Sequence, residues 1–398
     1  MSSPASSDEP TTSSDRVDLV VVGLGAMGSA VAYHATKLGL SVVGIDQHDP
    51  PHDLGSTKAE TRITRLAVGE GPQYLPFVKR SHEIWRELES VTGLDLLHES
   101  GGIIITEQVP VPGQRWEDFV LETARIAEEG NIAFDVLSPS EVRKQHPWIT
   151  VPDERNAGFE PTAGLVMAER AVEVQLKLAA GLGATIRVNE AVTAIEPLSD
   201  SVSVTTENGS LSADHVVLAT GPWFSELAAP AHGEQVTVTR QVVYWFEVDD
   251  LDAFSTTSIP FVMWIAQQDE DYIGLFPAPP GGTPAVKILG EQFLETTNAR
   301  AVDRSVSQAE IDHFYDTHVV PKFTGVSRNC IRTEVCLYTN TDDDHFLIDT
   351  DPRSDRITVM SPCSGHGFKH STGLGEAVAQ RIATGTSTHD LTPFRSRR

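Results

Sequence analysis

The chain has 398 residues, 40% of them hydrophobic and 22% charged, a composition that excludes collagen-like, low-complexity and largely disordered proteins and suits about two domains. With three cysteines and no long apolar run, it is neither a disulfide scaffold nor a membrane-spanning protein. The formal net charge of −26, with only eight lysines in the sequence, argues against nucleic acid or an anionic membrane as a partner and predicts a salt-adapted, halophilic surface.

Residues 1–16 are rich in Ser, Thr, Pro and acidic side chains and have no apolar face, so we expect a disordered tail. This segment lacks the positive start and apolar core of a signal peptide. Together with the unpaired cysteines, that absence predicts a cytoplasmic protein.

The tail is followed by a strand, a glycine-rich turn, a helix and a second strand. Val17–Val22 is a short apolar run of the kind that is buried on both faces of a parallel sheet. A Gly-x-Gly-x-x-Gly turn at 23–28 opens a helical stretch, and a strand at 41–45 ends in Asp46. These elements form a complete βαβ unit, which is typical of dinucleotide-binding domains.

Each position of this turn suits a dinucleotide. Gly23 permits the tight turn, Gly25 lets the backbone approach a pyrophosphate, and Gly28 lets helix and strand pack closely. The helix N-terminus offers free N–H groups to the phosphates, and Asp46 is placed to accept hydrogen bonds from the ribose hydroxyls. Asp46 disfavours NADP, but the turn alone does not separate NAD from FAD, and an unliganded turn is the alternative.

The rest of the chain is strand-rich in the middle and returns to the βα pattern at its end. A helix is expected at 168–180, a hairpin at Asn208-Gly209, strands between 235 and 291, and a helix at 307–319. The last elements are a strand at 357–361, a glycine-rich turn at 365–367 and a helix at 373–382.

We therefore predict an α/β fold with an α+β insert. The dinucleotide-binding domain is discontinuous and comprises residues 17–90, 150–225 and 325–390, whereas an antiparallel substrate domain comprises 91–149 and 226–324. We predict no metal site.

Five segments resemble, in order and spacing, the monomeric sarcosine oxidase and N-methyltryptophan oxidase group of FAD-dependent amine oxidases, in the D-amino-acid-oxidase-like superfamily. The segments are DLVVVGLGAMGSA, IDQHDPPHDLGSTKAETRITRLAVGEG, VVLATGPW, CLYTNTDDDHFLID and SGHGFKHSTGLGE. The resemblance implies a glutathione-reductase-like Rossmann domain with FAD as cofactor. The cofactor-binding residues that it implies are Gly23, Gly25, Met27, Gly28, Asp46, Ser56, Arg62, Val192, Gly221, Cys336, Gly365, Gly367, Phe368 and Lys369.

Cys336 is the residue that, by this resemblance, forms a thioether to the flavin. From the sequence alone, a cysteine between Val335 and Leu337 is an ordinary small buried side chain. The resemblance favours the covalent link.

The resemblance also assigns a set of cationic side chains to the active site. It implies that Arg62 and His366 lie near the flavin ring, and that Arg65 and Lys369 bind the substrate carboxylate. The spacing of Arg62 and Arg65 places them on neighbouring positions of a helical turn, and surface ion pairs are the alternative. His366 has an alternative as an ordinary loop histidine.

Lys287 stands in an apolar strand of a lysine-poor chain, and the resemblance places it over the flavin, where a positive charge would stabilise developing superoxide. The alternative is a lysine at a sheet edge that reaches to solvent. Sarcosine oxidases have a tyrosine before the Phe-Pro pair and a histidine four residues after this lysine. Here Gly274-Leu275 precede the pair and Glu291 takes the later position, so the substrate pocket differs.

The function implied is an oxidase of N-methyl or other secondary α-amino acids, with hydride transfer to flavin N5, reduction of O2 to hydrogen peroxide and hydrolysis of the imine. The substrate must react as the free amine, because an ammonium has no lone pair. The partners are a small amino acid and O2, and the resemblance implies a monomer. A dehydrogenase of the same fold with another electron acceptor, a non-catalytic FAD-binding subunit and an NAD dehydrogenase stay open as alternatives.

Overall fold

The computed structural model describes residues 16–107, 119–265 and 272–396. Within these ranges the strands form three sheets of eight, nine and three strands, which we call the first, second and third sheet. The expected disordered tail, apart from Arg16, lies outside the described residues. In the described part of the chain, no helix combines the length and apolar character needed to cross a bilayer.

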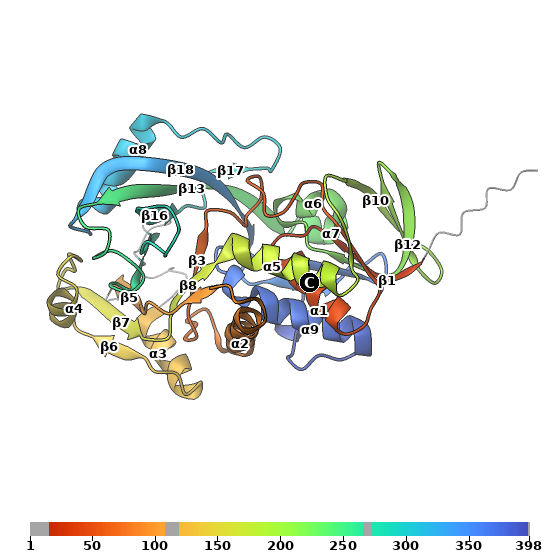
Figure 1. The fold of residues 1–398 in the computed structure, drawn as a ribbon, viewed down its shortest axis with the longest axis horizontal. Helices are drawn as coiled ribbons and strands as arrows, with labels where there is room; N and C mark the ends of the chain where they lie inside the picture. Colours follow the sequence, from red (N-terminus) through yellow and green to blue (C-terminus); the bar gives the residue numbers. More distant parts are fainter. Residues whose placement is uncertain (1–15, 108–118, 266–271, 397–398) are drawn as a thin grey trace, which may run out of the picture.

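The first sheet contains the βαβ unit predicted at the start of the chain. Strand β1 (Val17–Val22) pairs in parallel with β2 (Val42–Ile45) and with β12 (Gly209–Leu218), and α1 (Ala26–Lys37) joins β1 to β2. The strand order is β10-β11-β12-β1-β2-β9, with β20 beside β12 and β19 beside β20. Figure 1 shows β1, β10 and β12 on the right. The other strands are β9 (Thr185–Arg187), β10 (Val192–Pro197), β11 (Val202–Thr206), β19 (Leu347–Thr350) and β20 (Ile357–Ser361). The predicted hairpin at Asn208-Gly209 joins β11 to β12.

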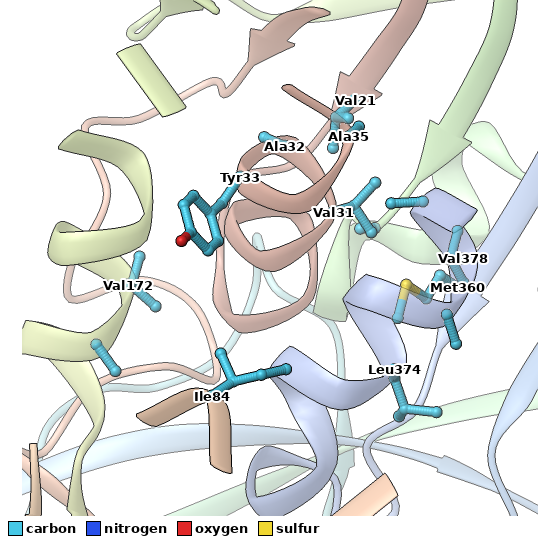
Figure 2. Packing of buried hydrophobic residues seen from close by; sticks show 14 of the residues in the cluster. Val21, Val31, Ala32, Tyr33, Ala35, Ile84, Val172, Met360, Leu374 and Val378 are labelled. Carbon is cyan, nitrogen blue, oxygen red and sulfur yellow. The ribbon is translucent and has the colours of Figure 1, made fainter. Parts of the chain in front are cut away.

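Helix α1 packs between α5 (Ala168–Gly181) and α9 (Ser371–Thr384), so residues from both ends of the chain share one core. Figure 2 shows Tyr33 of α1 pointing toward Val172 of α5, and Val31 pointing toward Val378 of α9. Burying one such apolar side chain contributes about 1.5–3 kcal/mol. This packing fixes the position of the turn that precedes α1.

The second sheet is mostly antiparallel and lies on the left of Figure 1. Its order is β17-β13-β16-β15-β14-β5-β7-β6, with β18 paired along β13. The strands are β5 (Gly102–Glu107), β6 (Asp135–Leu137), β7 (Arg155–Glu160), β13 (Val236–Val248), β14 (Phe261–Trp264), β15 (Tyr272–Phe276), β16 (Val286–Glu291), β17 (Thr296–Thr297) and β18 (Val326–Thr341). One face of this sheet is apolar and packs under α8 (Gln308–Phe314), where the ring centroids of Tyr244 and Phe314 are 4.3 Å apart.

The third sheet contains β3 (Thr61–Thr64), β8 (Gly164–Met167) and β4 (Leu97–His98), and Figure 1 shows β3 and β8 between the other two sheets. The remaining helices are α2 (Leu75–Thr92), α3 (Phe119–Glu129), α4 (Pro139–Gln145), α6 (Phe224–Leu227) and α7 (Pro230–Gly233). Short helical turns are η1 (Pro72–Tyr74), η2 (Gly221–Trp223), η4 (Phe368–His370) and η5 (Thr392–Phe394). The helix expected at 307–319 divides into α8 and a π-helical turn, η3 (Tyr315–Val319).

Two strands that the sequence assigned to the dinucleotide-binding segments lie in the second sheet instead. Strand β7 pairs with β5, and β18 pairs with β13 along most of its length. Both belong by position to the ranges 150–225 and 325–390, but the long-range hydrogen-bond partner decides the sheet to which a strand belongs. The division into two domains stays a prediction.

Candidate active site

The turn between β1 and α1 has the geometry that its glycine pattern predicts. Gly23 has a φ of 85°, and a Cβ atom at this position would lie 2.5 Å from the carbonyl oxygen of Ala219. A Cβ atom at Gly28 would lie 1.7 Å from the carbonyl oxygen of Gly23. A side chain at Gly23 would collide with the backbone that follows β12, and one at Gly28 would push α1 away from the turn, so both glycines are needed for the close approach.

A cavity of about 440 Å³ begins at this turn and is of the size of a small-molecule site. Its wall includes the turn before α1, the segment that follows β2, the end of β12 and the loop after β20. Three buried hydroxyl groups on the wall, those of Ser56, Thr220 and Ser361, have no hydrogen-bond partner among the described residues. Because buried polar atoms are almost always hydrogen-bonded, these hydroxyls indicate a polar ligand in the cavity.

Most of the residues predicted to bind the cofactor line this cavity. They are Gly23, Gly25, Met27, Asp46, Ser56, Arg62, Val192, Gly221, Gly365, Gly367 and Phe368. Gly28, Cys336 and Lys369 are not lining residues: Gly28 acts through packing, and the other two are buried near the cavity.

Asp46 lines the cavity at the end of β2 and already accepts two backbone hydrogen bonds. Its Oδ2 accepts from the N–H of Leu24 at 2.7 Å, and its Oδ1 accepts from the N–H of His48 at 2.9 Å. These bonds fix the carboxylate beside the turn before α1. A carboxylate has about four acceptor positions, so Asp46 retains the capacity to bind ribose hydroxyls.

One face of the second sheet carries two further predicted side chains, those of Lys287 and Cys336. Side chains alternate along a strand, and residues directly opposite one another on neighbouring strands point to the same side. The register pairs Tyr272 with Glu291 and Phe276 with Lys287, and it joins β16 to β18 through β13. We call the resulting surface the polar face; its members include Tyr272, Lys287, Glu291, Cys336 and Tyr338.

Cys336 is 3% exposed on the polar face, and Tyr338, two residues further along β18, lines the cavity. Burial raises the pKa of the Cys336 thiol, whereas the positive charges of Arg62 and Lys58 oppose that rise. The thiol therefore lies in an apolar cluster with Ala59, Val243 and Trp245, and the charges of Arg62 and Lys58 act on it.

Lys287 is buried in the interior of the second sheet, because β16 lies between β13 and β15. Its Nζ donates to the carbonyl oxygens of Ala59 at 2.8 Å and Thr61 at 2.6 Å and lies 4.1 Å from the ring centroid of Phe276. Burial lowers the pKa of Lys287 well below 10.5, and the charge of Arg62 lowers it further. The alternative of an edge lysine that reaches to solvent is wrong.

Arg62 and Arg65 do not lie on a helical turn, which corrects the expectation from their spacing. Residues 61–64 form β3, which pairs with β8, and this long-range pairing overrides the local pattern. A spacing of three in an extended chain turns the two side chains to opposite sides. Arg62 lines the cavity and donates to the carbonyl oxygens of Ser56 at 2.7 Å and Lys58 at 2.6 Å. Arg65 is 1% exposed, so it is not a surface ion pair.

Arg65 and Lys369 meet at one oxygen of Glu70. The Nη2 of Arg65 lies 2.6 Å and the Nζ of Lys369 lies 2.9 Å from the Oε1 of Glu70. His366 borders this group, since its Nδ1 lies 3.9 Å from the same oxygen and its carbonyl accepts from Lys369 at 3.0 Å. The structure therefore brings together three residues predicted for the site and adds a carboxylate between them.

The charges in this group depend on one another. Burial favours the neutral acid, but Arg65 and Lys369 outweigh it and hold the pKa of Glu70 well below its usual range. Burial lowers the pKa of Lys369 to about 8, although the charge of Glu70 opposes the shift. The two cations are thus arranged to hold a carboxylate.

Glu70 and Tyr338 were missed by the sequence reasoning. Glu70 stands between Gly69 and Gly71, and its partner Lys369 is far away in the sequence, so no local pattern reveals the pair. Tyr338 follows Cys336 by two positions on a strand, and this alternation was a signal that could have found it.

The cavity, the helix N-terminus at its wall and the three unpartnered hydroxyls fit a dinucleotide cofactor. The chain matches the model of the FAD dependent oxidoreductase family over residues 18–381. It is 32% identical over 388 residues to monomeric sarcosine oxidase from Bacillus sp. (strain B-0618), with 96% of each chain covered. It is 34% identical over 378 residues to N-methyl-L-tryptophan oxidase from Yersinia pestis (strain Pestoides F), with 95% of this chain and 98% of the relative covered.

A solved structure with a similar fold is that of NikD, described as an unusual amino acid oxidase essential for nikkomycin biosynthesis. The TM-score is 0.80 at 21% identity, with 96% of this chain and 98% of NikD covered. These matches confirm the α/β fold, the resemblance expected from the sequence and FAD as the cofactor.

Proposed function

Because the chain belongs to the FAD-dependent oxidoreductase family, we propose that it is an oxidase of N-methyl or other secondary α-amino acids. The names of two relatives, monomeric sarcosine oxidase and N-methyl-L-tryptophan oxidase, support this substrate class. The observation that carries the proposal is the pair Arg65 and Lys369, which already share one carboxylate oxygen, that of Glu70.

The same two cations would hold the substrate carboxylate. An ammonium has three N–H donors and a guanidinium has five. Among the described residues, Lys369 donates two hydrogen bonds, to Glu70 and to the carbonyl of His366, and Arg65 donates two, to Glu70 and to the carbonyl of Ala67. The unused donors, or those released by a movement of Glu70, would anchor the substrate and orient its reacting C–H bond.

FAD, when bound, accepts the hydride and passes the electrons to O2. Residues that line the cavity would hold it: the turn at Gly23 and Gly25 and the carboxylate of Asp46 at one end, and Arg62 with the turn at 365–368 at the other. We propose that Lys287 faces the O2 site, where its charge would stabilise a developing anion. Its two bonds to carbonyl oxygens favour the charged ammonium.

We propose Cys336 as the covalent attachment point of FAD. Support comes from its place on the polar face two residues from Tyr338, which lines the cavity, and from the cations Arg62 and Lys58 around its thiol. Acid denaturation should leave the yellow colour with the polypeptide in the natural chain and release it from Cys336→Ala. A chain that loses its colour in acid without any substitution would overturn this part.

The proposed function is tested by anaerobic titration of the yellow protein with a panel of N-methyl amino acids. Bleaching of the flavin absorbance by at least one of them is expected, and peroxide should form in equal amount once air is admitted. If no member of the panel bleaches the flavin, the proposal is wrong; if bleaching occurs without peroxide, the protein is a dehydrogenase with another acceptor.

We extend the proposal to a salt-adapted, cytoplasmic monomer. The net charge of −26 supports salt adaptation, and the unpaired cysteines of the described residues support a cytoplasmic location. The name of the sarcosine oxidase relative supports a monomer. Sedimentation at 0.1 M and 2 M salt would test the monomer, and a single species of about twice the chain mass would contradict it.

A further inference from the structure

Glu291 is a carboxylate on the polar face that the proposed function does not use. It is the last residue of β16, partly buried, and directly opposite Tyr272 on β15. Because Lys287 stands four positions earlier on the same strand, both side chains point to the same side of the sheet. The carboxylate therefore belongs to the surface that carries the proposed oxygen and flavin residues.

Tyr338 and Gly365 fix this carboxylate at the border of the cofactor cavity. The hydroxyl of Tyr338 donates to the Oε1 of Glu291 at 3.0 Å. A Cβ atom at Gly365 would lie 3.1 Å from that oxygen and 3.1 Å from Cε2 of Tyr338, so the loop after β20 packs closely against the pair, and its φ of 76° favours glycine there. Both Tyr338 and Gly365 line the cavity, which places Glu291 one contact away from it.

Among the described residues, the charge of Glu291 acts on four titratable groups, those of Tyr272 of β15, Tyr338 of β18, Cys363 of the loop after β20 and Lys369 of η4. The charge of Arg62 of β3 lowers the pKa of two of them, Tyr338 and Cys363. Burial raises the pKa of Tyr338 well above 10, and the charge of Glu291 adds to the rise. Tyr272 and Cys363 are raised in pKa by burial and by Glu291 in the same way, so all three neighbours stay neutral at pH 7.

Lys369 connects Glu291 to the carboxylate anchor. Burial lowers the pKa of Lys369 to about 8, and the charges of Glu70 and, to a smaller extent, Glu291 oppose that shift. Glu291 is thus near enough to the anchor for its charge to act there. The site therefore has two cations, Arg65 and Lys369, and a carboxylate on the polar face whose charge acts on Lys369.

This layout matches the two charges of a zwitterionic amino acid. We propose that Glu291 binds the ammonium group of the substrate and accepts its proton, with Tyr338 as a positioning residue. The inference rests on the proposed function, since it needs an amino acid anchored by Arg65 and Lys369. One N–H bond of the ammonium breaks, an O–H bond forms on Glu291, and the electron pair stays on nitrogen. The free amine that results is the form that can be oxidised, and the proton on Glu291 later passes to solvent.

The test uses Glu291→Gln in the holoenzyme, because glutamine keeps the shape and can still accept from Tyr338. Anaerobic flavin reduction is followed between pH 6 and pH 10 with the best N-methyl amino acid of the panel. At pH 7 the rate should fall by about 100-fold, whereas at pH 10, where the substrate arrives as free amine, the two proteins should agree within about threefold. Glu291→Asp should recover part of the rate at pH 7.

Binding gives a second readout that a merely structural role would not move. The affinity for the amino acid at pH 7 should fall on the order of tenfold or more in Glu291→Gln, but that for methoxyacetate, which has a carboxylate and no amine, should not change. Glu173→Gln, which removes an exposed carboxylate of α5, controls for the loss of one negative charge. Tyr338→Phe should lower the rate at pH 7 less than Glu291→Gln does.

The outcomes separate this inference from the proposed function. If the natural chain is bleached and Glu291→Gln shows the same pH profile, the inference is wrong and the proposed function stands. Equal losses of methoxyacetate and amino acid binding would also overturn it, because they indicate a damaged site. If no N-methyl amino acid bleaches the natural chain, both fail.

Discussion

Replacement of Glu70 by glutamine tests the carboxylate anchor most directly. The natural carboxylate lies 2.6 Å from Arg65 and 2.9 Å from Lys369, and the side chains of all three residues are no more than 6% exposed. Glutamine has almost the same shape but no charge. Glu70→Gln therefore leaves two buried cations without their counter-ion while the packing is preserved.

The expected loss of stability follows from this burial. Removal of one partner of a buried ion pair costs about 3–5 kcal/mol, because the other charge is left uncompensated. Glutamine can still accept a hydrogen bond, so we expect the lower end, about 3 kcal/mol, in the free energy of unfolding at pH 7. Since the pKa of Glu70 is held well below 4.5, its contribution should be complete above pH 4.5 and be lost as the pH falls through the lower folded value.

Urea titration of the holoenzyme measures this loss, and added methoxyacetate distinguishes its cause. A ligand at 100 times its dissociation constant stabilises the folded state by about 2.7 kcal/mol, so methoxyacetate should restore most of the stability of Glu70→Gln. It should also bind this variant more tightly than the natural chain, in which Glu70 competes for the same cations. The control is Glu173, whose exposed carboxylate on α5 lies 2.7 Å from the Nζ of Lys177. Glu173→Gln should leave the free energy of unfolding unchanged.

Two results would refute the reasoning. A Glu70→Gln protein as stable as the natural chain would mean that Glu70 does not compensate the two cations. A destabilised variant that binds methoxyacetate no better than the natural chain would mean that Arg65 and Lys369 do not form a carboxylate site.

The remaining predictions concern the oxygen step, the turn before α1 and the surface charge. Lys287→Met should slow the reaction of reduced flavin with O2, whereas flavin reduction by the substrate should persist. In the natural chain the rate of the O2 reaction should fall as the pH rises through the lowered pKa of Lys287. Stopped-flow measurements over a pH series should find this fall in the natural chain and not in the variant. Gly28→Ala should destabilise the protein by about 2 kcal/mol and weaken FAD binding, because its Cβ would lie 1.7 Å from the carbonyl oxygen of Gly23. Gly181→Ala, whose Cβ would have no atom within 4 Å, should change neither the stability nor FAD binding. The melting temperature should rise between 0.1 M and 1 M KCl, because screening weakens the repulsion of a net charge of −26, and a melting temperature independent of salt would argue against a salt-adapted surface.

The parts of the fold that depend on local sequence were predicted well. The strand, turn and helix at 17–37, the hairpin at 208–209 and the helix expected at 168–180 each follow from a periodicity and a glycine position within a short window. The arginine segment was predicted wrongly as a helical turn, because β3 is held by β8, about one hundred residues further along the chain.

The candidate site was predictable to the extent that its residues are marked by local motifs. The glycine turns and Asp46 line the cavity as their patterns indicate. Glu70 lies within one of the segments that carry the family resemblance, but its role comes from Lys369, 299 positions later, which no local pattern indicates. The hydrogen bond of Tyr338 to Glu291 likewise joins two strands whose adjacency no short window contains.

The hydrogen bonds of Lys287 have a consequence for the order in which the protein is completed during synthesis. Its ammonium binds the carbonyl oxygens of Ala59 and Thr61, which precede it by 228 and 226 positions. Ala59 and Glu60 have φ values of 69° and 62°, a conformation that side chains rarely adopt without support from their surroundings. On the ribosome this segment emerges long before its lysine does, so the N-terminal part of the chain carries an unfinished loop until β16 has been translated. This part of the candidate site can therefore take its final shape only after β16 has been translated.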